Sequence, residues 1–103
     1  MKIKVIYFLL FCNFSILFSQ ETGSLKGKII DAQTRESLPF VSIIVEGTNI
    51  GTSTDEFGMF TINNVPLGYV KIKASFLGFQ TQLSDDYLVT IDKTPYIFIE
   101  LFQ

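Results

Sequence analysis

The segment Tyr69–Leu77, with the sequence YVKIKASFL, decides the fold class of this chain. Apolar residues occupy its even positions from 70 to 76, and two lysines and a serine occupy the odd positions between them. Successive side chains of a β-strand point to opposite faces, so this alternation predicts a strand with one buried and one wet side. No stretch after residue 20 keeps the three-to-four spacing of an amphipathic helix for long. The sequence therefore predicts an all-β fold.

The same alternation extends outward from this segment in both directions. The expected strands are Leu25–Ile29, Val41–Val45, a short one near Thr52–Asp55, Met59–Asn63, Tyr69–Leu77, Tyr87–Ile91 and Tyr96–Leu101. The residues expected to face the core are Leu25, Gly27, Ile29, Val41, Ile43, Val45, Phe60, Ile62, Val70, Ile72, Ala74, Phe76, Ile97, Ile99 and Leu101, whereas Glu100 is expected to face outward. Seven short strands about ten residues apart indicate a two-sheet sandwich or a small barrel.

Two segments between the expected strands have the composition of tight turns. In Asp55-Glu56-Phe57-Gly58, the Asp55 carboxylate can accept a hydrogen bond from the backbone two residues later, and Gly58 can take a positive φ. This turn would fold the short third strand back onto the fourth. In Val65-Pro66-Leu67-Gly68, Pro66 fixes its own φ and Gly68 closes the turn.

Residues 1–19 have the composition of a removable secretory signal. Lys2 and Lys4 form a charged n-region, the nearly unbroken apolar run Val5–Phe18 forms an h-region, and Ser19 is small enough for the cleavage position. The polar residues 20–24 then form a short linker. Two other interpretations, a transmembrane anchor and a lipoprotein, are disfavoured. The apolar run is about 14 residues, short of the roughly 20 that a membrane-spanning helix needs. Lipidation of Cys12 would require a small residue where bulky Phe11 stands.

Length and charge limit the remaining chain to one domain. After removal of residues 1–19, 84 residues remain, with six Lys and Arg against ten Asp and Glu, a formal charge of −4. A chain of this size supports one modest core, and an acidic balance argues against a nucleic-acid partner. The exported part has no cysteine, so apolar packing must hold residues 25–103 together without disulfides.

Six motifs, taken in order, resemble one known family. They are Gly27–Asp31 (GKIID), Leu38–Val41 (LPFV), Gly47–Asp55 (GTNIGTSTD), Gly58–Phe60 (GMF), Val65–Tyr69 (VPLGY) and Ser75–Phe79 (SFLGF). This ordered set, which spans about residues 25–102, resembles the carboxypeptidase-regulatory-like domain found at the N-termini of TonB-dependent receptors of Bacteroidetes. The resemblance implies a seven-stranded Greek-key β-sandwich of the transthyretin-like, or prealbumin-like, kind. It also implies export to the periplasm or to the periplasmic face of the outer membrane.

The resemblance does not extend to a transporter. Family members that precede receptors continue into a short energy-coupling motif, a plug domain and a transmembrane barrel, whereas the sequence here stops at Gln103, where the last expected strand ends. We therefore expect either a free-standing accessory domain or the remnant of a truncated receptor, with a protein partner in the periplasm or outer membrane.

The sequence predicts no catalytic residues, no cofactor-binding residues and no metal ligands. The chain contains no histidine, which the resembling zinc carboxypeptidases and the transthyretin-like hydrolases both require. No Ser, Thr and Lys spacing supports a nucleophile with its base. Asp85-Asp86 could contribute to a calcium site, but a calcium loop needs several alternating oxygen ligands, so a solvated turn is favoured. We expect a protein that is not an enzyme.

The leading interpretation of the function is an interaction module, with strand addition at an open sheet edge as one mode. The alternative is a carbohydrate-binding module. Its candidate groups are the hydroxyls of Thr48, Thr52, Ser53 and Thr54 and the rings of Tyr69, Phe76 and Phe79. Strands favour threonine and aromatic residues for packing reasons alone, so structural roles are favoured for both sets. The lysines Lys26, Lys28, Lys71 and Lys73 could form a basic stripe, but lysine on outer or edge strands also prevents aggregation.

Overall fold

The computed structural model describes residues 21–103, and the expected signal over residues 1–19 lies outside the described residues. The described chain is all-β and contains no helix. Its strands are β1 (Thr22–Asp31), β2 (Ser42–Val45), β3 (Gly51–Ser53), β4 (Met59–Pro66), β5 (Gly68–Val70), β6 (Ile72–Ser75), β7 (Gln82–Leu83), β8 (Tyr87–Val89) and β9 (Tyr96–Leu101). The predicted fold class, an all-β sandwich, is confirmed.

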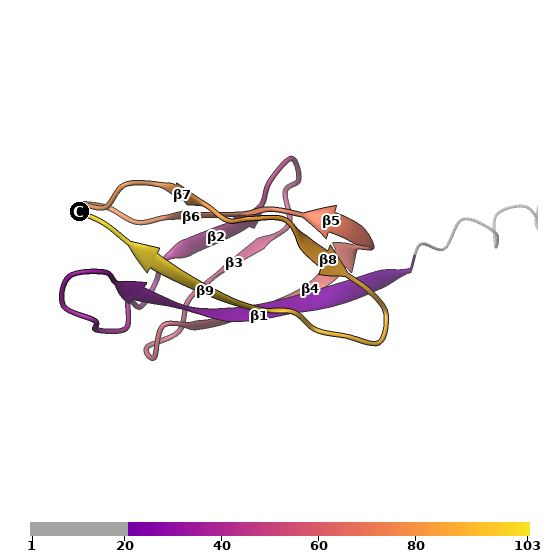
Figure 1. Ribbon diagram of the computed structural model, residues 1–103, viewed down its shortest axis with the longest axis horizontal. Helices are drawn as coiled ribbons and strands as arrows, with labels where there is room; N and C mark the ends of the chain where they lie inside the picture. The colour runs from indigo at the N-terminus through magenta and orange to yellow at the C-terminus, as the bar shows by residue number, and fades with distance from the viewer. Residues whose placement is uncertain (1–20) are drawn as a thin grey trace, which may run out of the picture.

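The strands form two main layers and one small ribbon (Figure 1). The first layer has the order β4-β1-β9, with β1 antiparallel to β4 and parallel to β9. The second layer has the order β3-β2-β6-β7 and is antiparallel throughout. Strands β5 and β8 form a separate two-stranded ribbon, beside the end of the sandwich at which the described chain begins. The C-terminus lies at the opposite end of the sandwich.

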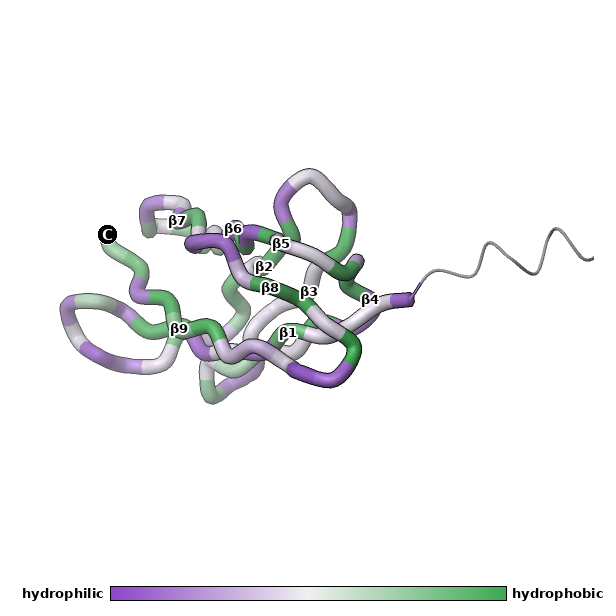
Figure 2. Tube along the Cα trace, turned by 45° about the vertical axis from the view of Figure 1, so that its right-hand side comes forward, coloured by the Kyte–Doolittle hydropathy of each residue, from purple (hydrophilic) through white to green (hydrophobic). Residues whose placement is uncertain are grey.

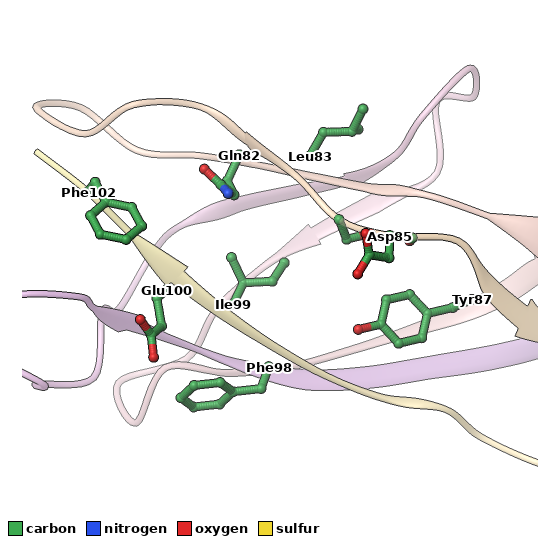
Figure 3. Close-up of a pocket in the computed structure, with 9 residues that line it drawn as sticks. Gln82, Leu83, Asp85, Tyr87, Phe98, Ile99, Glu100 and Phe102 are labelled. Carbon is green, nitrogen blue, oxygen red and sulfur yellow. Dashed lines mark hydrogen bonds between the residues drawn. The ribbon is translucent and has the colours of Figure 1, made fainter.

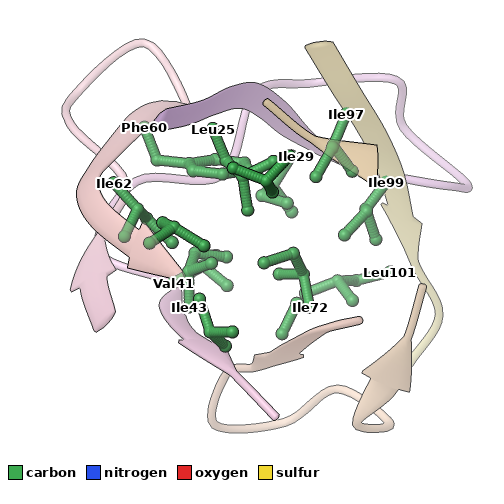
Figure 4. Close-up of a cluster of buried hydrophobic side chains, with 14 residues drawn as sticks. Leu25, Ile29, Val41, Ile43, Phe60, Ile62, Ile72, Ile97, Ile99 and Leu101 are labelled. Atoms are coloured by element: carbon green, nitrogen blue, oxygen red, sulfur yellow. The ribbon is translucent and has the colours of Figure 1, made fainter. Parts of the chain in front are cut away.

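The core lies between the two layers and is made of aliphatic side chains and one phenylalanine ring (Figure 4). Its members are Leu25, Ile29, Val41, Ile43, Val45, Phe60, Ile62, Val65, Ile72, Ala74, Val89, Ile97, Ile99 and Leu101. Period-two alternation predicted most of these. Val70 and Phe76 were also expected in the core, and they pack against it but are only half-buried. Gly27 is also buried. A Cβ added there would clash with the Ile97 carbonyl and the Phe60 ring. Here the absence of a side chain lets β9 and Phe60 close over β1.

Residues 21–103 form nine strands where seven were expected, and two differences account for the change. The expected strand Tyr69–Leu77 is divided at Lys71, because β5 pairs with β8 whereas β6 pairs with β2. The short β7 was not predicted, and it pairs with β6 after the turn at residues 76–79. At the N-terminal side, Thr22–Ser24 belong to β1 although the sequence suggested a linker over residues 20–24.

Candidate interaction surface

The acidic side chains of the sequence motifs hold turns. The Asp55 carboxylate accepts hydrogen bonds from the backbone amides of Phe57, at 2.9 Å, and Met59, at 3.0 Å. Gly58 closes this turn with φ +75°, so the predicted turn between β3 and β4 is confirmed. Asp31, which is buried at the end of β1, accepts in the same way from the amide of Gln33 at 2.8 Å. These carboxylates shape the backbone, because turn amides otherwise need water or another acceptor.

The threonines of the hydroxyl-rich stretch also have structural roles. Thr54 is almost fully buried, and its hydroxyl donates to the Leu38 carbonyl at 2.7 Å and accepts from the Val41 amide at 2.9 Å. The Thr48 hydroxyl donates to the Val45 carbonyl at 2.8 Å. Among residues 21–103, no buried side-chain nitrogen or oxygen lacks a hydrogen-bond partner. Two of the four hydroxyls proposed for glycan contact are therefore committed within the chain.

Only two of the three aromatic residues named for a glycan platform lie together. Tyr69 is 74% exposed on β5, where its cross-strand partner is Leu88. Phe76 and Phe79 lie at the turn after β6, with ring centroids 5.8 Å apart, and pack against the core. Several residues of extended chain, roughly 20 Å, separate Tyr69 from Phe76. The structure thus brings Phe76 and Phe79 together but not Tyr69.

The four lysines do not form one stripe. Lys26 and Lys28 are on β1, the middle strand of the first layer, and Lys73 is on β6 in the second layer. Lys71 lies between β5 and β6, with its ammonium nitrogen 3.4 Å from a carboxylate oxygen of Asp86. Because β1 and β6 are inner strands of their sheets, the lysines on them make the outer faces polar and do not protect a sheet edge.

The outer face of the first layer carries an apolar row that sequence reasoning had not singled out. Tyr96 and Phe98 are about half exposed on β9, and Met59 is 38% exposed on β4. The register places Lys28 of β1 between Met59 and Phe98, and Lys26 beside Tyr96. Figure 2 shows the hydrophobic colour along much of β9, a strand that combines inward Ile97, Ile99 and Leu101 with outward Phe98. The alternation that placed Ile97 inward also places Tyr96 and Phe98 outward, so the sequence contained the signal.

Strand β9 is also an open edge of its sheet. The Lys26 amide donates to the Pro95 carbonyl at 3.1 Å, and the Ala32 amide donates to the Leu101 carbonyl at 2.9 Å. In a parallel pair, every second residue of a strand directs both its N–H and its C=O toward the partner strand, and the residues between them direct theirs away. The odd-numbered residues of β9 therefore bond to β1, and the N–H and C=O groups of Tyr96, Phe98 and Glu100 point away from it. No other strand among the described residues pairs with β9.

A groove of about 270 Å³ lies beside this open edge (Figure 3). Phe98, Glu100 and Phe102 line it from the β9 side. The other side is lined by Leu83 at the end of β7, Asp85 in the segment that joins β7 to β8, and Tyr87 at the start of β8. The Gln80 amide donates to the Phe102 carbonyl at 2.7 Å. This hydrogen bond closes the free edge at its C-terminal end.

The wall opposite β9 is fixed to the second layer. The Ser84 amide donates to the Ile72 carbonyl at 2.8 Å, and the Ser84 hydroxyl accepts from the Ile72 amide at 2.8 Å. The next residue, Asp85, is exposed and lines the groove, whereas Asp86 pairs with Lys71. Across the groove, the Glu100 carboxylate is 2.8 Å from the Arg35 guanidinium. Of the two lining carboxylates, Asp85 is thus the one without an ion pair among residues 21–103.

Within residues 21–103, no group of three or more acidic, histidine or cysteine side chains is arranged to hold a metal ion. The same part of the chain has no helix of the length and apolar character needed to cross a bilayer.

Comparison with known proteins establishes the class of this domain. The chain belongs to the CarboxypepD_reg-like domain family, whose model matches residues 25–98. The resemblance drawn from the sequence motifs is thereby confirmed, and this family is a regulatory-like, non-catalytic β-sandwich domain. The search of curated proteins found no match.

Several solved structures share the sandwich fold. A chain of a type II cohesin–X-dockerin complex from Acetivibrio cellulolyticus superposes with a TM-score of 0.64 at 19% identity, over 75% of this chain and 52% of that one. The Bacillus anthracis TIE protein gives a TM-score of 0.62 at 19% identity, over 80% of this chain and 16% of that one. The major pilin subunit of Bacillus cereus gives 0.62 at 17% identity, over 80% and 30%. This chain thus spans about half or less of the length of these proteins, and the likeness concerns the fold.

Proposed function

We propose that this chain is a non-catalytic interaction domain at the periplasmic side of the outer membrane, related to a TonB-dependent receptor for nutrient uptake. The domain carries out no reaction and works by holding a protein partner.

One observation carries the interaction role. The polar groups of the family motifs, such as those of Asp55 and Thr54, are bonded within the chain, whereas β9 leaves backbone groups and the rings of Tyr96 and Phe98 accessible. A domain that uses its motif residues for shape and keeps an open sheet edge has the features of a binding scaffold. One of the similar structures is itself a chain of a protein–protein complex, which is consistent with this role.

The cellular part of the proposal rests on the signal-like residues 1–19 and on the family. Fractionation of the source cells, with mass spectrometry of the purified protein, tests it. We expect the protein in the periplasmic or outer-membrane fraction with Gln20 as its first residue, because cleavage should follow Ser19. A cytoplasmic protein that retains residues 1–19 would contradict the proposal.

A carbohydrate-binding module is a second candidate because of the row on β9. Tyr96 and Phe98 are two residues apart on one strand, so their half-exposed rings lie on the same face of the sheet. Titration with soluble oligosaccharides, followed by protein NMR, tests this role. Tyr96→Ala should abolish binding, whereas Tyr69→Ala should leave it unchanged. If neither variant differs from the wild type, or if no oligosaccharide binds, this candidate is wrong.

A further inference from the structure

We propose that the groove beside β9 binds an extended peptide segment that adds a strand to the β4-β1-β9 sheet and places a lysine or arginine opposite Asp85. This inference deepens the proposed interaction function and rests on it. It names the site, the binding mode and the chemistry of the partner.

The backbone of β9 supplies the first argument. Tyr96, Phe98 and Glu100 each direct one N–H and one C=O away from β1, a pattern fixed by the two hydrogen bonds at the ends of the pair. An incoming strand satisfies such groups with alternating main-chain hydrogen bonds. The edge also lacks the usual protection, because β9 contains no lysine, proline or bulge.

The opposite free edge of the same sheet provides a contrast. Strand β4 is interrupted near its end by Asn64, whose φ is +62°, and it finishes at Pro66. Its outward residues beyond Met59 are the polar Thr61 and Asn63. Kinks, proline and polar side chains discourage strand addition. Of the two edges of this sheet, β9 is therefore the one suited to a partner.

The side chains of the groove indicate which partner fits. Phe98 and Phe102 are each about half exposed and offer apolar contacts to side chains of an added strand. The charged side chains that line the groove are Asp85 and Glu100, and Arg35 already pairs with Glu100. Asp85 has no ion-pair partner among residues 21–103, so its carboxylate favours a cationic residue in the bound segment.

The same charges disfavour a second copy of this chain as the occupant. In a two-fold pairing of β9 with itself, two grooves lined by carboxylates would meet, and residues 20–103 carry a formal charge of −4. Like charges that face one another at an interface weaken it. A basic extended segment has the complementary charge and fits within the groove without bringing a second acidic wall.

Selection from a phage-displayed library of random peptides, about ten residues long to span one strand, tests the proposal. The bait is residues 21–103, which contain the whole described core. We expect enriched peptides with apolar residues at alternate positions and at least one lysine or arginine. The most enriched peptide is then synthesised and titrated against isotope-labelled protein, and the amide signals of Phe98 and Glu100 should shift.

Two variants of the protein separate edge pairing from other contacts. Phe98→Pro removes an N–H that points away from β1, so the sheet is retained while the peptide binds roughly tenfold more weakly or not at all. Thr61→Pro is the matched control, because Thr61 occupies the corresponding outward position on β4. Circular dichroism confirms that both variants are folded.

A charge variant keeps the test decisive if Phe98→Pro does not fold. Asp85→Lys should weaken binding of the lysine-containing peptide roughly twofold to fivefold, with the loss decreasing at high salt. Glu56→Lys, at an exposed turn residue that does not line the groove, should leave binding unchanged.

The outcomes separate the proposal from its alternatives. Peptides that bind Phe98→Pro as well as the wild type, enriched peptides without alternation or with acidic residues, or no enrichment would overturn it. A dimer in analytical ultracentrifugation that Phe98→Pro dissociates would assign the edge to a second copy and also overturn it. The selection uses purified protein, so its failure would leave the cellular location untouched, and a cytoplasmic location would leave the peptide result standing.

Discussion

Replacement of Gly58 by valine should cost this fold a large part of its stability. Gly58 has φ +75°, and an added Cβ would lie 2.6 Å from the Ile29 carbonyl oxygen and 3.1 Å from the Leu38 amide nitrogen. A non-glycine residue in this region costs roughly 1–3 kcal/mol, and the displacement of packed neighbours costs about as much again. The expected loss is therefore roughly 2–6 kcal/mol, against the roughly 4–12 kcal/mol that a domain of this size possesses.

Gly47→Val separates the two contributions. Gly47 has φ +81°, close to that of Gly58, but an added Cβ there would have no neighbour within 4 Å. The same substitution should therefore cost only the backbone term, roughly 1–3 kcal/mol. Urea unfolding, followed by far-UV circular dichroism, measures the difference. With a slope of about 1 kcal/mol per molar urea for a small domain, the midpoint of Gly58→Val should fall roughly 1–3 M below that of Gly47→Val.

Equal midpoints for the two variants would refute the reasoning. They would mean that the close approach between Gly58 and Ile29 has no energetic consequence and that the positive φ alone explains the glycine. An unchanged midpoint for Gly58→Val would remove the dihedral argument as well.

The remaining predictions concern three polar side chains. Thr54→Val should lose about 1–3 kcal/mol of unfolding free energy, because the Leu38 carbonyl and the Val41 amide lose their buried partner. Thr54→Ser keeps the hydroxyl and should lose less. A reversed order of the two variants in urea unfolding would contradict the structural role of the Thr54 hydroxyl. Asp55→Ala should lose roughly 1–2 kcal/mol, because two turn amides lose their acceptor. Asp85→Ala should stay within about 0.5 kcal/mol of the wild type, so a larger thermal shift for Asp85→Ala than for Asp55→Ala would show that the acidic groups are misassigned.

Local pattern was sufficient to predict most of the buried side chains. Strand alternation depends only on the backbone geometry of consecutive residues, so Ile43, Ile72 and Ile97 could each be placed inward without knowledge of any partner strand. The turn at Gly58 was equally accessible, since the positive φ and the aspartate acceptor are properties of adjacent residues.

Strand pairing was not accessible in this way. Val70 and Ile72 keep the same parity across Lys71, so the alternation continues unbroken where the chain leaves β8 and joins β2. A change of partner produces no local signal in such a segment. The parallel pairing of β1 with β9 and the resulting open edge are likewise set by distant parts of the chain. The groove at that edge therefore could not be predicted, although the outward rings that border it could.

The pairing of β1 with β9 also sets the order in which this domain can be completed during synthesis. Lys26 pairs with Tyr96, about 70 positions later, so the middle strand of the first layer waits for the last strand to leave the ribosome. Contacts between such distant segments raise the contact order and slow folding, because the entropy cost of closing a long loop comes before the stabilising contacts form. Before β9 arrives, one whole side of β1 is unpaired and Ile97, Ile99 and Leu101 are missing from the core. The β4-β1-β9 sheet of a nascent chain therefore stays incomplete until β9 has been synthesised.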